Sequence, residues 1–349
     1  MRTSNQNDSD VVFEVRDLEV TFGTKRGESR VVRNVDFDIH RNETLGMVGE
    51  SGSGKSMTSS ALMNAVVSPG ETSGEVTYYP PDGGEPISVL DLDEDELRRF
   101  RWGEVAMVFQ GAMSSFNPVK KVRGHFVETL EDHNRDVEAG LERAHKILGD
   151  LYLDPDRVLD SYPYELSGGM KQRALIGLAL ILEPEVLVMD EPTAALDLLM
   201  QRSIVALLKE LKTEYDLTII FITHDLPLLT KLADRLIVMY AFDIVEVGST
   251  DDILYDAAHP YTRSLLNATP DLKAPIEEMQ SISGAKPDPV TNVPGCSYHP
   301  RCPMATEACK AQEPPMEDRS ASHRTACIHH EDVSDEIPIP AKPMEGELQ

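Results

Sequence analysis

A glycine-rich run near the N-terminus combines the residue types that bind phosphate groups. Residues 49–56 read GESGSGKS, whose glycines let the backbone turn so that successive N–H groups point at a β- and a γ-phosphate. Lys55 adds a cation, and the hydroxyl of Ser56 is a ligand for Mg²⁺. The expected nucleotide contacts are Gly49, Glu50, Ser51, Gly52, Ser53, Gly54, Lys55, Ser56 and Met57. A plain glycine turn is the alternative, but a strand pattern before the run and a helix pattern after it favour a phosphate site.

Two adjacent carboxylates follow an apolar run further along the chain. Val186–Met189 leads directly into Asp190 and Glu191. A carboxylate at the carboxyl end of a buried strand suits the Mg²⁺ shell of phosphate-loop enzymes, so Asp190 is expected there. Glu191 stands one residue further on, where it can polarise an attacking water. A pair of acids that merely caps a strand–turn is the alternative.

The elements that must position these groups have clear sequence patterns. Alternating residues predict two antiparallel strands, Val11–Val20 and Val31–His40, joined by a charged turn. Thr44–Val48 is an apolar strand that enters the glycine run, and Ser56–Val67 is the expected helix after it. The remaining expected elements are strands at Val105–Phe109, Val186–Met189, Thr218–Thr223, Leu236–Tyr240 and Ile244–Val247, helices over 120–165 and a loop over 80–100.

Taken in order, these motifs resemble the ATP-binding subunit of an ABC transporter over nearly the whole chain. GESGSGKS resembles the Walker A loop, VLVMDE the Walker B strand and LSGGMKQ (166–172) the ABC signature. The resemblance implies an α/β fold, namely a RecA-like P-loop NTPase with an antiparallel β subdomain. It also implies a helical subdomain inserted at about 115–165 within a nucleotide-binding domain of residues 11–250.

The same resemblance implies roles for residues outside the glycine loop. Gln110 in VAMVFQ matches the Q-loop glutamine, a further Mg²⁺ ligand at the joint with the helical insert, and Asp197 matches the D-loop. His224 in FITHD matches the switch histidine that orients the γ-phosphate beside Glu191. Phe22 falls where an aromatic residue stacks on adenine, with a core position as the alternative. The signature residues expected to bind the γ-phosphate of a partner's nucleotide are Ser167, Gly168 and Gly169.

The segment HPYTRSLL, which begins at His259, narrows the resemblance to the ATPases of dipeptide and oligopeptide importers. It opens the C-terminal extension of that subfamily, expected here over 251–330. The implied function is ATP hydrolysis that drives peptide uptake through separate membrane subunits. Oligosaccharide or nickel uptake is the alternative. A soluble ABC ATPase without a transport role is less favoured, because the chain has one Walker A loop and one signature.

Several partners follow from the resemblance. They are a second ABC ATPase subunit (a distinct chain in a heterodimer, with a homodimer as the alternative), two membrane permease subunits and an extracellular substrate-binding protein. The sequence has no run of 18 apolar residues and no signal peptide, so the subunit is expected to lie peripherally on the cytoplasmic side of the membrane.

Four cysteines, Cys296, Cys302, Cys309 and Cys327, are the only ones in the chain. Disulfides are not expected in a reducing cytoplasm, and four thiolates suit a [4Fe–4S] cluster or structural zinc. The spacing of the four cysteines does not distinguish between the cluster and zinc. Some members of the resembling subfamily hold a [4Fe–4S] cluster in this extension, which favours the cluster over zinc or no metal. His299 and His323 are spare ligands or, more simply, surface histidines.

The acidic composition excludes one class of partner. The net charge is −27, with no basic stripe to neutralise a nucleic acid backbone. Self-repulsion that keeps a halophile protein soluble in concentrated salt explains such a charge, and an acidic face that docks a basic partner is the alternative. Residues 1–10 and the acidic tail 331–349 are expected to be disordered.

Overall fold

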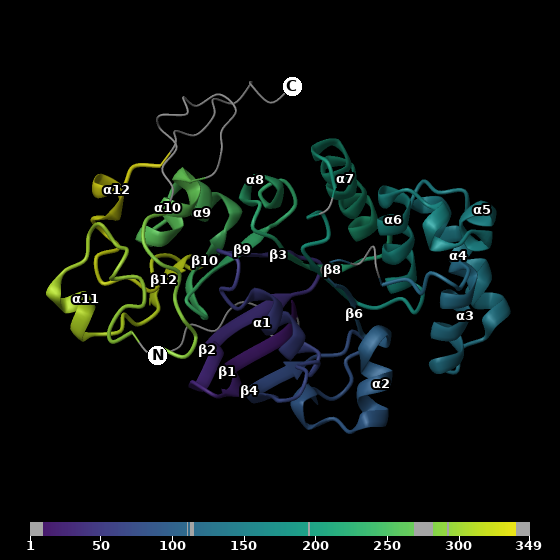
Figure 1. The fold of residues 1–349 in the computed structure, drawn as a ribbon, viewed down its shortest axis with the longest axis horizontal. Coiled ribbons are helices and arrows are strands. Elements are labelled where there is room, and N and C mark those ends of the chain that lie inside the picture. Colours follow the sequence, from purple (N-terminus) through teal and green to yellow (C-terminus); the bar gives the residue numbers. More distant parts are fainter. Residues whose placement is uncertain are drawn as a thin grey trace.

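The computed structural model describes residues 10–109, 111, 115–194, 196–268, 282–291 and 293–339. Figure 1 shows a small sheet below a larger one, a group of helices at one end of the larger sheet and the C-terminal segment (the described residues between 250 and 339) at its other end. Within the described part of the chain, no helix is long and apolar enough to cross a membrane.

The N-terminal strands form the predicted antiparallel layer. The sheet has the order β2-β1-β4-β5, in which β1 (Val11–Thr24) pairs with both β2 (Gly27–His40) and β4 (Gly70–Tyr78). The fourth strand is the short β5 (Ile87–Ser88). Strands β1 and β2 are longer than expected, because their pairing continues to Thr24 and Gly27 and leaves only Lys25 and Arg26 in the turn.

The larger sheet has the order β11-β12-β10-β9-β3-β8-β7-β6. Its parallel part runs β9-β3-β8-β7-β6, and β10, β12 and β11 continue it in antiparallel pairing. The strands are β3 (Thr44–Val48), β6 (Val105–Val108), β7 (Val186–Asp190), β8 (Thr218–Ile222), β9 (Arg235–Tyr240), β10 (Asp243–Ser249), β11 (Glu317–Asp318) and β12 (Arg324–Thr325). Every residue of β3, β7 and β8 is buried, as apolar runs covered on both faces require.

Helices cover the sheets and build the end group. Helix α1 (Lys55–Leu62) follows β3, and α7 (Leu198–Glu214) and α8 (Leu226–Leu229) follow β7 and β8. The end group beyond β6 consists of α3 (Val122–Asp132), α4 (Val137–Asp150), α5 (Pro155–Asp160) and α6 (Gly168–Ala179). It shares one apolar core with the larger sheet, and the indole N–H of Trp102 donates to the Leu178 carbonyl at 2.9 Å. The C-terminal helices are α9 (Thr250–Tyr255), α10 (Pro260–Asn267), α11 (Glu307–Ala311) and α12 (Val333–Glu336).

Three expectations about local structure are corrected. Residues 80–100 are not only loop, because α2 (Glu94–Gly103) begins there with a capping box between Asp93 and Glu96. Helix α1 ends at Leu62, well before Val67. Residues 331–339 of the tail lie in the described part of the chain and include α12. Residues 1–9 and 340–349 lie outside the described residues.

Candidate functional site

The glycine loop lies between β3 and α1, at the carboxyl end of the parallel sheet. Gly49 and Gly54 have φ angles of +156° and +110°. A Cβ at Gly49 would lie 2.2 Å from the Met239 carbonyl oxygen, and one at Gly54 would lie 2.7 Å from that of Val31. Only glycine fits such close backbone approaches at these angles. The loop thus turns directly into the N-terminus of α1, the end of a helix that attracts anions.

Lys55 folds back across this loop. Its ammonium group donates to the carbonyl oxygens of Gly49 at 2.8 Å and Glu50 at 3.0 Å, and to the Ser53 hydroxyl at 3.3 Å. The side chain is 5% exposed, and burial lowers the pKa of Lys55 to about 8, although Glu191 and Asp190 oppose that shift. The negative charge of a bound polyphosphate would stabilise the charged form of this desolvated ammonium group.

Ser56 and Asp190, the two residues expected to bind Mg²⁺, lie in direct contact. The Ser56 hydroxyl donates to Asp190 Oδ1 at 3.0 Å across the gap between α1 and β7. Burial raises the pKa of Asp190, and the nearby Glu191 charge raises it further. The hydrogen bond from Ser56 acts in the opposite direction. A divalent cation would favour the charged carboxylate, so the donor set fits Mg²⁺.

Glu191 and His224 lie side by side after neighbouring strands β7 and β8. Glu191 Oε1 is 3.0 Å from His224 Nδ1. The Glu191 backbone N–H donates to the Ile222 carbonyl at 2.9 Å, and its φ of +45° turns the chain sharply at the end of β7. The Glu191 side chain is 13% exposed and that of His224 60% exposed. The pair therefore presents a carboxylate with an adjacent imidazole beside the phosphate loop.

The signature residues lie elsewhere, at the start of α6 in the end group of helices (Figure 1). Ser167 is the N-cap of α6, and its hydroxyl accepts from the Met170 N–H at 3.3 Å. Asp197 caps α7 in the same way through the Met200 N–H at 2.9 Å. The two caps are neighbours, because a Cβ at Gly169 would lie 1.9 Å from the Met200 methyl group. Within one chain the signature and the glycine loop thus belong to separate regions.

Three further residues were expected to contact the nucleotide, namely Phe22, Met57 and Gln110. Phe22 lies near the end of β1, and its ring packs on Gly70 of β4. Both Phe22 and Met57 are partly buried against the core of the smaller sheet. Gln110 lies outside the described residues.

The four cysteines surround one cavity of about 20 Å³ in the C-terminal segment. All four are free thiols, and the cavity is also lined by Tyr298, His299 and His329. Burial raises the pKa of Cys302 to about 11 and that of Cys327 to about 12, with the other thiols adding to both shifts. In the ranges described above, no group of three or more His, Cys, Asp or Glu side chains is arranged to hold a metal ion.

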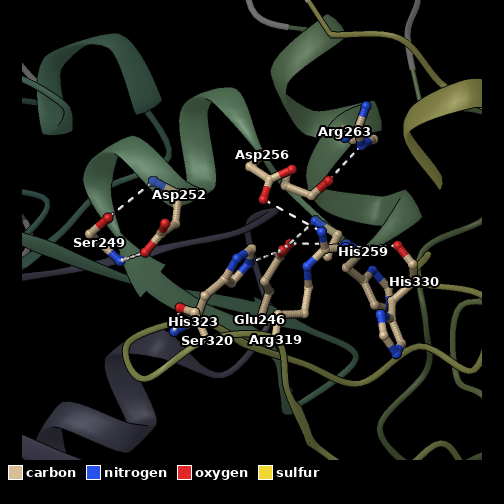
Figure 2. Close-up of polar contacts among 12 residues, drawn as sticks. Glu246, Ser249, Asp252, Asp256, His259, Arg263, Arg319, Ser320, His323 and His330 are labelled. Atoms are coloured by element: carbon tan, nitrogen blue, oxygen red, sulfur yellow. Dashed lines mark hydrogen bonds and ion pairs between the residues drawn. The ribbon is translucent and has the colours of Figure 1, made fainter. Parts of the chain in front are cut away.

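A buried carboxylate that sequence reasoning missed attaches the C-terminal segment to the larger sheet (Figure 2). Glu246 of β10 is 0% exposed and accepts from the backbone N–H groups of Ala258 at 2.5 Å and His259 at 3.2 Å. Its Oε1 lies 2.8 Å from His323 Nε2. His323 is therefore a buried partner of Glu246 and not the surface histidine that we expected. The alternation of β10 is the only sequence signal for an inward-facing Glu246.

The fold and this site define the class of P-loop nucleoside triphosphatases. Family models for "ABC transporter" and "Oligopeptide/dipeptide transporter, C-terminal region" match residues 32–194 and 245–309. The chain is 40% identical to the oligopeptide transport ATP-binding protein OppD of Escherichia coli, over 93% of this chain and 94% of that protein. It is 39% identical to the dipeptide transport ATP-binding protein DppD of Caldanaerobacter subterraneus, over 92% and 98%.

Solved structures agree with this class. The dimeric bacterial ABC transporter cassette MJ0796 is similar with a TM-score of 0.59 and 27% identity, over 68% of this chain and 98% of that chain. The chain belongs to the ABC transporter family, in the branch of the oligopeptide and dipeptide transport ATP-binding proteins. It is an ABC-type ATPase, and the predicted fold class is confirmed.

Proposed function

We propose that this subunit is the motor of a peptide importer, in which ATP binding and hydrolysis drive uptake of dipeptides or oligopeptides through separate membrane subunits. The observation that carries the proposal is the convergence of Lys55, Asp190 and the Glu191–His224 pair at one edge of the parallel sheet. The peptide cargo is supported by the OppD and DppD relatives, which match over more than nine-tenths of the chain.

In the proposed mechanism, the backbone N–H groups of residues 49–56 and Lys55 bind the β- and γ-phosphates. Mg²⁺, held by Ser56, Asp190 and Gln110, would neutralise charge on the transferred phosphoryl group. Glu191 polarises the attacking water, and His224 orients Glu191 and the γ-phosphate. The ring of Phe22 stacks on adenine. Hydrolysis thus depends on positioning and charge stabilisation and requires no covalent intermediate on the protein.

The separation of the two motif regions supports a head-to-tail pair of ATPase subunits. Ser167, Gly168 and Gly169 of one subunit would bind the γ-phosphate held by the other, with Asp197 near the shared interface. ATP then stabilises the closed pair by binding it more tightly than the open subunits. We propose a distinct second ATPase subunit, two permease subunits and an extracellular binding protein as partners. The subunit then lies peripherally on the cytoplasmic side.

Uptake in cells tests the importer. In a strain whose only copy carries Glu191→Gln, uptake of labelled dipeptides and oligopeptides should be lost, while a labelled disaccharide and nickel serve as the alternative cargoes. Selective loss of disaccharide or nickel uptake would replace the proposed peptide cargo. Normal uptake of all four would contradict an importer of these substrates and favour an ABC ATPase without a transport role.

We also propose that Cys296, Cys302, Cys309 and Cys327 hold a [4Fe–4S] cluster. The proposal is supported by the convergence of the four thiols on one cavity and by the raised pKa values of Cys302 and Cys327, which a bound cation would reverse. In the described residues these side chains are not arranged to hold a metal ion, so loading requires the thiols to rearrange. Anaerobically purified protein should contain iron and sulfide and lose both in Cys302→Ser. Zinc in place of iron, or neither metal, would refute the cluster.

The acidic composition has its own proposed role, as an adaptation that keeps the protein soluble in concentrated salt. A net charge of −27 supports it, because screening by salt relieves the self-repulsion that such a charge imposes on the folded state.

A further inference from the structure

The C-terminal segment contacts the phosphate loop at Glu50. The Glu50 carboxylate accepts from the Arg301 guanidinium at 2.6 Å (Nη1 to Oε2) and 3.3 Å (Nη2 to Oε1). The Glu50 backbone N–H donates to the Tyr261 hydroxyl at 2.8 Å. Both partners lie more than two hundred residues away along the chain, so the C-terminal segment fixes both the side chain and the peptide group of Glu50.

These contacts lead directly to the phosphate-binding lysine. The Glu50 carbonyl accepts from Lys55 Nζ at 3.0 Å. Glu50 is thus bound on three sides, by Tyr261 at its N–H, by Arg301 at its carboxylate and by Lys55 at its carbonyl oxygen. The peptide group whose N–H binds Tyr261 also carries the Gly49 carbonyl, which accepts from Lys55 Nζ at 2.8 Å. A displacement of that peptide group would therefore move an acceptor of the Lys55 ammonium group.

The Arg301 guanidinium is buried and has hydrogen-bond acceptors in addition to Glu50. Its side chain is 3% exposed, and besides Glu50 it donates to the Ser283 carbonyl at 2.7 Å and the Ile282 carbonyl at 3.2 Å. It also lies over the Tyr240 ring, 5.7 Å from the ring centroid. A planar fork with this set of acceptors orients a carboxylate far better than a flexible ammonium group does.

The hydroxyl of Tyr261 is equally fixed. Tyr240, Tyr261 and Tyr298 form a buried aromatic cluster with ring centroids 4.5 to 5.5 Å apart. Tyr261 lies in the first turn of α10, whose N-cap His259 is held by Glu246 (Figure 2). Arg301 follows Tyr298 in a turn closed by the 2.9 Å bond from the Arg301 N–H to the Tyr298 carbonyl. The same turn ends at Cys302, a wall of the cysteine cavity.

We propose that Arg301 and Tyr261 are positioning residues for ATP: through Glu50 they fix the phosphate loop and the Lys55 ammonium group in the geometry that binds the β- and γ-phosphates. Neither residue touches the reacting atoms. The C-terminal segment is on this view a part of the nucleotide site, and its removal would weaken ATP binding even where the cassette stays folded. The inference rests on ATP binding at this loop, as proposed above.

The test compares ATP affinity and turnover among variants of the full chain. Arg301→Gln should raise the KM for ATP by about 10-fold while kcat in the assembled transporter falls much less. Arg301→Lys keeps the charge but not the fork and should recover part of the affinity. Tyr261→Phe removes only a hydroxyl from a packed ring, and the expected rise in KM is about 3-fold.

A matched control separates positioning from general attachment of the C-terminal segment. Arg319 also lies in this segment and pairs with Asp256 at 3.5 Å, but it does not contact the phosphate loop. Arg319→Gln should leave the KM for ATP unchanged. Equal effects of Arg319→Gln and Arg301→Gln would overturn the proposal, because both would then act by loosening the segment.

A double-mutant cycle identifies Glu50 as the intermediary. If Arg301 acts through Glu50, the KM of the Glu50→Gln/Arg301→Gln double variant equals that of Glu50→Gln alone. Additive effects, or normal ATP affinity in both Arg301→Gln and Tyr261→Phe, would overturn the proposal. Binding of a fluorescent ATP analogue to the purified chain distinguishes this failure from that of the proposed function, since a wild-type chain without nucleotide affinity would refute the site itself. If the uptake experiment refuted peptides as the cargo while these ATP results held, the positioning role of Arg301 and Tyr261 would still stand.

Discussion

Glu191 Oε1 and His224 Nδ1 lie 3.0 Å apart although the two residues belong to different strand–turn segments. Parallel pairing of β7 with β8, in which Asp190 lies opposite Ile222, brings the two segments to the same edge of the sheet. The histidine can orient the carboxylate only in this register, because a shift of one residue would turn it to the other face.

The Glu191–His224 pair predicts a hydrolysis defect without a binding defect. Glu191→Gln keeps the shape of the side chain but removes the base, so the hydrolysis rate should fall by about 10² to 10³-fold. Phosphate release by the assembled transporter measures the rate, and a fluorescent ATP analogue measures binding. Glu210→Gln changes an exposed glutamate of α7 that pairs with Tyr152 and should have no effect on either measurement. Hydrolysis at the wild-type rate in Glu191→Gln would remove Glu191 from its proposed role.

Asp243 predicts a pH dependence of stability. Burial raises the pKa of Asp243 to about 7, and the charge of Glu313 adds to the shift. The folded state therefore retains a proton that the unfolded state releases between about pH 4 and pH 7. Across that window this carboxyl group lowers the free energy of unfolding as pH rises, by at most about 1.4 kcal/mol per pH unit.

Asp243→Asn removes this titration and keeps an acceptor for the Ile244 N–H, which donates to Asp243 at 2.7 Å. In urea unfolding, the variant should match the wild type near pH 4 and exceed it at pH 8, because only the wild type must bury a charge there. A difference between the two proteins that does not change with pH would show that Asp243 titrates normally.

The buried carboxylate of Glu246 predicts that Glu246→Gln lowers the stability of the fold far more than the same substitution at the exposed Glu317. Glu246→Gln places an amide donor among three N–H donors, those of Ala258, His259 and His323, so at least one of them loses its acceptor. The expected cost is about 3 kcal/mol, measured by urea unfolding and by protease cleavage within the C-terminal segment. Glu317→Gln, which breaks an exposed pair with His330, should cost less than about 1 kcal/mol. Equal costs would mean that burial at Glu246 has no special effect.

The net charge of −27 predicts that salt stabilises the folded state. Raising KCl from about 0.1 M to about 1 M shortens the screening length from about 10 Å to about 3 Å, so the unfolding temperature should rise. A non-ionic solute at the same osmolality controls for effects that do not involve charge. An unchanged or lower unfolding temperature in KCl would contradict the proposed adaptation to salt.

Much of the nucleotide-binding fold could be predicted from local patterns. The apolar runs of β3, β7 and β8 are fully buried, and GESGSGKS turns where its glycines allow positive φ angles. Helix α2 was wrongly expected to be loop because its acidic residues hid a helix start, the capping box of Asp93 and Glu96. A capping box is a sequence signal for a helix start even where the surrounding residues are charged.

The C-terminal contacts could not be predicted, for a physical reason. Arg301 and Glu50 are 251 residues apart, and neither has a spacing that identifies its partner. The same holds for Glu246 and His323, which are 77 residues apart. Such pairs form only when separate elements pack, so periodicity within one element carries no information about them.

Strands β12 and β11 of the C-terminal segment also extend the larger sheet beyond β10. Strand β12 pairs with β10 at Glu246 and Val247, and β11 then closes the pairing with two residues of its own. A chain cut after α9 would leave the backbone N–H and C=O groups along that side of β10 without partners. Such an open edge is a template for pairing with a second copy of the chain. The C-terminal segment therefore covers that side of β10, and a shortened cassette should be prepared with the same side charged or covered.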